Sequence, residues 1–205
     1  MKKIVTLILV ILFATSCKKI NENSVSSENN LATKKEESAK PLLKKVTENS
    51  NVLCQINGQS WAYTKASGIV STHAKTGKRT ALITFKKKLE KGSESIQLHY
   101  DVASFELEAV SLQLKFPKKD GKLSTCYYDL HPDTRNRNPQ SELSGSIDLS
   151  DLTAASGMAE LKNINIKYEK ESLQNVEDAI INITGLKFMN VGYSDIDKFV
   201  KAYKK

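Results

Sequence analysis

Val110-Ser111-Leu112-Gln113-Leu114-Lys115-Phe116 is the stretch that decides the fold, because apolar and polar residues alternate strictly along it. A period of two is typical of a strand that packs one face against a core and leaves the other face in water. The same alternation recurs in residues 96–100 and 143–149. Polar turns separate these segments and no regular alternation of strands with helices is present, which favours an antiparallel sheet.

Similar segments continue on both sides of this stretch, from residue 52 to residue 188. They predict an all-β fold, an antiparallel β-sandwich or barrel of about nine to eleven strands. The apolar parity changes between Leu107 and Val110 and again between Leu161 and Ile164, so a bulge or turn is expected at each place. Four strand glycines follow a hydroxyl residue, and glycine there is typical of a bulge or a close backbone approach: Gly68, Gly145, Gly157 and Gly185.

The folded part is expected to begin with a hairpin and to end with a short helix. Asn57-Gly58 favours the positive φ angles of a tight turn. It follows a strand whose inward face is predicted to be Val52, Cys54 and Ile56, and it precedes the Trp61 strand. Near the other end, Ser194 is a suitable helix cap and apolar residues follow with helical spacing. A C-terminal helix is therefore predicted.

The amino end has the features of a secretory signal peptide over residues 1–16. Lys2 and Lys3 precede an apolar run over residues 4–13, and small residues follow. Ten apolar residues in a helix span about 15 Å, half of a bilayer core of about 30 Å, so a membrane-spanning helix is disfavoured.

The segment Ala14-Thr15-Ser16-Cys17 resembles the lipobox of bacterial lipoproteins. The resemblance implies cleavage before Cys17, attachment of lipid to its thiol and acylation of its new amino group. Several acyl chains hold a protein on a membrane durably. Lys18 follows where an Asp would signal retention in the inner membrane, so the resemblance implies the outer membrane, facing the periplasm. The cell surface is the alternative location.

Composition divides the rest of the chain into a tether and one domain. Residues 17–50 begin with the lipidated cysteine and continue in Asn, Ser, Lys and Glu, which bury too little apolar surface to fold. We expect them to form a flexible tether. Residues 51–205 are long enough for a single β-rich domain. Cys17 together with the hairpin Asn57-Gly58-Gln59-Ser60-Trp61 resembles small Gram-negative lipoproteins of uncharacterised all-β families, a resemblance that implies no activity.

The sequence offers little catalytic or metal-binding chemistry. Its three histidines lack metal-ligand spacing, so no metal and no cofactor is expected. No nucleophile elbow or phosphate-binding loop occurs, which makes an envelope enzyme the weakest of the functional hypotheses. Cys54 and Cys126 lie on predicted strands. An oxidising periplasm permits a disulfide between them, and two buried free thiols are the alternative.

Charge gives the clearest functional signal, because the net charge is +8 and lysines concentrate in predicted turns. In an up-and-down meander, one end of the domain would collect Lys86, Lys87, Lys88, Lys91, Lys118, Lys119 and Lys122. The other end would collect Lys75, Lys78, Arg79, Arg135 and Arg137, so each end would be basic. Such a patch suits an acidic protein, glycan or lipid, and its charge is too sparse for nucleic acid. Solubility alone also explains lysine-rich turns. The sequence therefore predicts a membrane-anchored, non-enzymatic binding or envelope-accessory module, with a periplasmic inhibitor or immunity lipoprotein as the alternative.

Overall fold

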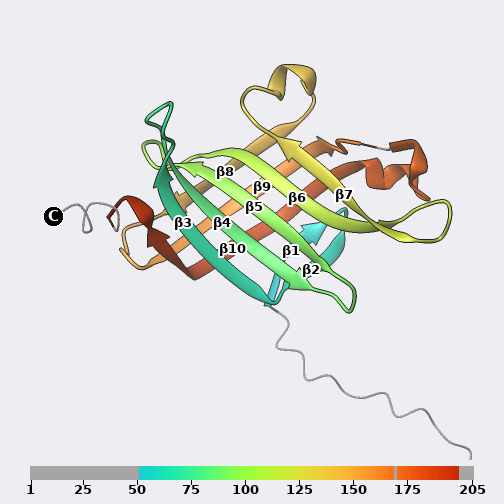
Figure 1. Ribbon diagram of the computed structural model, residues 1–205, viewed down its shortest axis with the longest axis horizontal. Helices are drawn as coiled ribbons and strands as arrows, with labels where there is room; N and C mark the ends of the chain where they lie inside the picture. The colour runs from blue at the N-terminus through green and yellow to red at the C-terminus, as the bar shows by residue number, and fades with distance from the viewer. Residues whose placement is uncertain (1–50, 169, 199–205) are drawn as a thin grey trace, which may run out of the picture. The chain divides into compact units, whose positions relative to one another are not determined.

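The computed structural model describes residues 51–168 and 170–198, and it confirms the all-β prediction (Figure 1). The predicted signal peptide (1–16) and tether (17–50), with Cys17, lie outside the described residues. No helix within the described part of the chain is long and apolar enough to cross a bilayer.

The described residues of the domain form ten strands and three short 3₁₀ helices, and a further helix begins at residue 196. In chain order the strands are β1 (Asn51–Ile56), β2 (Gln59–Tyr63), β3 (Lys65–Thr72), β4 (Arg79–Lys88), β5 (Ser93–Asp101), β6 (Leu107–Pro117), β7 (Leu123–Leu130), β8 (Glu142–Asp148), β9 (Ala154–Asn165) and β10 (Ile180–Asp195). The 3₁₀ helices are η1 (Arg135–Arg137), η2 (Lys170–Ser172) and η3 (Val176–Ala179).

Strands β3 to β7 form an antiparallel meander, as the alternating pattern predicts. The long strand β10 connects this meander to the rest of the sheet. Its first part pairs with β1, it pairs with β9 along most of its length, and its last residues pair with β3. The β10–β3 pairing is parallel, so the sheet is mixed rather than purely antiparallel.

The sheet does not close, and its two parts face each other across one core. Isolated bridges join Glu106 to Ser146 and Tyr128 to Ile166 across the seam. The arrangement matches the predicted β-sandwich. Large inward residues such as Phe85 and Tyr100 are fully buried, and their rings lie 5.4 Å and 6.3 Å from that of Phe188. The meander is therefore a rigid support for the side chains on its outer face.

Both predicted parity changes occur at register shifts. Tyr100 pairs with Leu107 while His99 pairs with Ala109, which leaves Glu108 as the extra residue. A second shift lies between the Ile181 and Ile183 pairs, opposite Asn163 with φ of 55°. The Asn57-Gly58 turn also forms as predicted, with φ of 47° and 79°.

One face assignment in β1 is wrong. Val52 is 56% exposed, whereas Leu53 and Cys54 are both buried. A register shift between Val52 and Cys54 explains the difference, because a bulge turns the residues before it to the opposite face.

A C-terminal helix begins at residue 196, and the described residues end at residue 198. The predicted cap is one residue too early. Ser194 is still part of β10, and the carboxylate of Asp195 accepts a hydrogen bond from the backbone N–H of Lys198.

Candidate functional site

The meander brings the predicted lysines to one end of the domain. The β4–β5 and β6–β7 turns lie on one side of Figure 1, and the β3–β4 and β5–β6 turns lie on the opposite side. This placement follows from the antiparallel pairing, because alternate turns of a meander share an end. We call the end that carries Lys86, Lys88, Lys91 and Lys119 the lysine-rich end.

Some of the lysines predicted for this patch interact with other residues. The Nζ of Lys87 lies 3.4 Å from Glu94, and that of Lys122 lies 3.5 Å from Asp120. The backbone of Lys118 bridges to Leu173. For Lys86, Lys88, Lys91 and Lys119 no ion pair is found among the described residues.

The opposite end of the domain also carries basic residues. Lys78 forms ion pairs with Glu108 and Asp101, and Arg79 pairs with Asp195 and Asp197. Acidic partners therefore neutralise Lys78 and Arg79. Lys75 and Arg137, at the same end, have no ion pair among the described residues.

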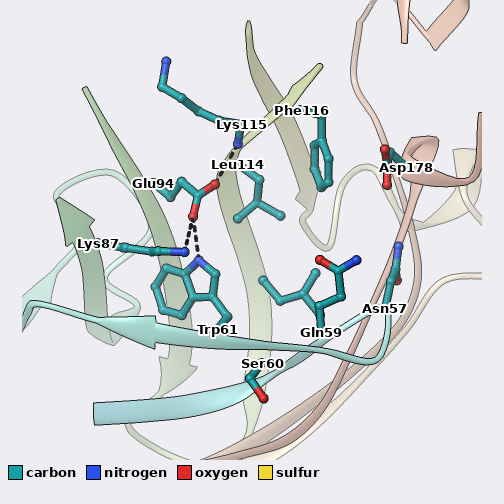
Figure 2. A pocket seen from close by; sticks show the side chains of 11 residues that line it. Asn57, Gln59, Ser60, Trp61, Lys87, Glu94, Leu114, Lys115, Phe116 and Asp178 are labelled. Atoms are coloured by element: carbon teal, nitrogen blue, oxygen red, sulfur yellow. Dashed lines mark hydrogen bonds and ion pairs between the residues drawn. The ribbon is translucent and has the colours of Figure 1, made fainter. Parts of the chain in front are cut away.

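A small cavity of about 160 Å³ opens at the lysine-rich end, between β2, the adjoining ends of β4 to β6, and η3 (Figure 2). Leu114 and Phe116 are apolar parts of its wall, and Asp178 lies on the side of η3. Burial raises the pKa of Asp178 above its usual value of 3.8, although a hydrogen bond with Asn175 opposes the change.

Glu94 occupies the wall of this cavity and is only 9% exposed. One carboxylate oxygen accepts a hydrogen bond from Trp61 Nε1 at 2.9 Å and lies 3.4 Å from Lys87 Nζ. The other oxygen accepts from the backbone N–H of Lys115 at 3.0 Å. We call these four residues the Glu94 cluster. Because donors occupy both oxygens, the cluster joins β2 to the meander rather than offering a free base.

The two cysteines do not form the disulfide that the sequence permits. Cys54 on β1 and Cys126 on β7 are separate buried thiols, and these strands are not neighbours in the sheet. Burial raises the pKa of the Cys54 thiol to about 12. It therefore remains protonated at neutral pH and behaves as a small core side chain.

Sequence reasoning missed a histidine pair on the outer face of the meander. The alternation of β5 predicts that His99 faces water, and it does lie on the outer face, but its ring contacts that of His131 at 5.6 Å. Burial, and then the neighbouring His131, lower the pKa of His99 below 6.5. His131 lies just beyond β7. It comes into contact with His99 on β5 only because β5, β6 and β7 pair side by side in the sheet.

This lowered pKa predicts that mild acid destabilises the fold through His99. The unfolded chain takes up a proton near pH 6.5, whereas folded His99 does so only at lower pH. The free energy of unfolding should therefore fall as pH drops below about 7, until the lowered pKa is reached. Urea denaturation across this range should show a weaker pH dependence for His99→Gln than for the wild type. An identical pH dependence in both proteins would contradict the assignment.

No set of three or more His, Cys, Asp or Glu side chains in residues 51–168 and 170–198 could hold a metal ion. Comparison with protein-family models, curated proteins and solved structures finds no match to this chain. The fold and the site define a β-sandwich domain with a lysine-rich end, where four lysines have no ion pair among the described residues.

Proposed function

We propose that the protein is a lipoprotein of the outer membrane, anchored through Cys17 and facing the periplasm. Its β-sandwich binds an anionic partner without catalysing a reaction. The lipobox-like segment Ala14-Thr15-Ser16-Cys17 supports the anchor. A domain held durably on the membrane would act there through its exposed surface.

One observation carries the binding proposal: two neighbouring turns of the meander bring four lysines without an ion pair among the described residues to the same end, Lys86, Lys88, Lys91 and Lys119. A cluster of exposed positive charge raises the local concentration of an anionic ligand and increases its association rate. The Glu94 cluster, which includes Lys87, joins β2 to the meander at this end.

Charge removal at the lysine-rich end should weaken anion binding. We expect Lys88→Gln combined with Lys119→Gln to reduce affinity for hyaluronan or polyglutamate about three- to tenfold, since an exposed charge contact contributes up to about 1 kcal/mol. The measurement is titration of the full chain in detergent, at low and high salt. Binding should weaken as salt rises, because salt screens exposed charges.

The matched control is Lys75→Gln combined with Arg137→Gln, which removes the same charge from the opposite end. This variant should bind like the wild type. Equal losses in both double variants would mean that only net charge matters. The absence of any salt-sensitive binding would overturn the proposal.

A further inference from the structure

A second concave surface lies on the outer face of the meander, on the side of the sheet opposite the core. It has a volume of about 330 Å³ and crosses β5, β6 and β7. Lys167 and Tyr168, just beyond β9, form its wall. The backbone N–H of Lys167 donates to the carbonyl of Tyr127 at 2.8 Å, so a hydrogen bond fixes the wall to β7. We call this surface the tyrosine groove.

Polar side chains from neighbouring strands form the floor of the tyrosine groove. In one row across the sheet, Gln97 pairs with Ser111 and Ser111 with Asp129. In the next row, Gln113 pairs with Tyr127. Amide and hydroxyl groups both donate and accept hydrogen bonds. The floor therefore suits a ligand that carries many hydroxyl groups.

Two tyrosines supply the apolar contact that such a ligand needs. Tyr127 on the floor is 45% exposed, and Tyr168 on the wall is 61% exposed. An aromatic ring offers a large flat surface at a small cost in side-chain entropy. The C–H face of a sugar ring packs on such a surface while its hydroxyl groups hydrogen-bond to neighbouring amides. Exposed tyrosines beside Gln97 and Gln113 fit this combination.

Charge is distributed unevenly along the same rows. Within the groove, the Nζ of Lys167 lies 3.4 Å from Asp129, so this pair is compensated. The Gln113 row continues through Ser95 to Lys86, which belongs to the lysine-rich end. Lys115 lies two residues beyond Gln113 on β6, so it is on the same face of that strand, and like Lys86 it has no ion pair among the described residues. A ligand that spans the tyrosine groove and the adjoining lysines would therefore contact neutral polar groups in the groove and positive charge beyond it.

We infer that the tyrosine groove, together with Lys86 and Lys115, binds an acidic oligosaccharide laid across β5 to β7. The inference rests on the proposed binding function and names the class of its ligand. Sugar rings pack on Tyr127 and on the exposed part of Tyr168, and they hydrogen-bond to the floor. The Tyr168 ring also has Lys167 Nζ over it, 5.5 Å from the ring centroid. Carboxylate groups of the ligand lie beside the lysines.

An extended acidic peptide fits this surface less well. A peptide added to a sheet needs unpaired backbone groups at a strand edge. At the groove, the Lys167 N–H already occupies the Tyr127 carbonyl, and Tyr128 bridges to Ile166. The groove therefore presents side chains rather than a free strand edge.

The test is calorimetric titration of the full chain in detergent with short oligosaccharides of hyaluronan and of polygalacturonate. Neutral chitin oligosaccharides and polyglutamate serve as comparison probes. We expect at least one acidic oligosaccharide to bind at least about tenfold more tightly than either comparison probe. Tyr127→Ala should reduce that affinity about tenfold, whereas Tyr127→Phe, which keeps the ring, should reduce it much less.

Leu123→Ala is the matched control, because Leu123 is exposed on the same strand but lies outside the groove. It should bind like the wild type, and circular dichroism should show that all variants are folded. If Tyr127→Ala binds unchanged while Lys88→Gln/Lys119→Gln loses affinity, the groove assignment is wrong and the proposed function stands. Polyglutamate binding as tight as that of the sugars would likewise overturn the assignment. Failure of every anionic probe would overturn both proposals.

Discussion

Glu94→Ala should lower the free energy of unfolding by about 2–4 kcal/mol, a large share of the 5–15 kcal/mol typical of a domain. Removing the carboxylate leaves the Trp61 Nε1–H and the Lys115 backbone N–H without their acceptor. It also leaves Lys87 without its ion pair. An unsatisfied buried donor costs about 1–3 kcal/mol, and this change creates more than one.

Chemical denaturation monitored by fluorescence measures this effect directly, because Trp61 is the only tryptophan in the chain. Glu94→Gln should cost less than Glu94→Ala, since the amide oxygen still accepts one hydrogen bond. Glu90→Ala is the control, because Glu90 is an exposed carboxylate in the adjoining β4–β5 turn. If Glu94→Ala were no more destabilising than Glu90→Ala, the Glu94 cluster would have no structural role.

Gly157→Ala should lower the free energy of unfolding by about 2–3 kcal/mol through crowding alone. A Cβ atom at Gly157 would lie 2.6 Å from the backbone oxygen of Ser146 and 2.7 Å from the Phe188 ring. The first contact is with the backbone of the paired strand β8, which cannot move without disturbing the β8–β9 ladder. The second is with an aromatic ring of the core.

Gly192→Ala provides a matched control, because it adds the same methyl group to the neighbouring strand β10. Its Cβ would meet nothing closer than the Thr153 oxygen at 4.0 Å. This variant should be neutral or slightly stabilising, since alanine reduces the entropy of the unfolded chain. Thermal unfolding of both variants tests the difference, and equal melting temperatures would contradict the close approach at Gly157.

Much of the fold follows from local sequence patterns, because inward and outward residues alternate along each strand. Both parity changes predicted register shifts, since a single extra residue moves every following side chain to the other face. The strand glycines were predicted to mark bulges or close approaches. Gly68, Gly145 and Gly157 lie where a Cβ would meet backbone or core atoms within 3.0 Å, and Gly185 lies at a shift between β9 and β10.

Pairing between distant strands could not be predicted in the same way. The parallel contact of β10 with β3 joins Tyr193 to Gly68, and no local pattern encodes that choice of partner. The Glu94 cluster and the His99–His131 contact also depend on such long-range placement. The gathering of lysines at one end could be predicted, because alternate turns of a meander always share an end. The ion pair between Lys87 and Glu94 could not be predicted from the sequence.

The proposed lipid anchor at Cys17 would give the surface chemistry of the β-sandwich its biological setting. The most direct test is the intact mass of the full-length protein extracted from membranes of the cell that makes it. We predict a chain that begins at Cys17 and carries the added mass of fatty acyl groups on that residue. A chain that is uncleaved, or that begins elsewhere without fatty acids, would contradict the proposal that this domain works as a membrane-anchored binding protein.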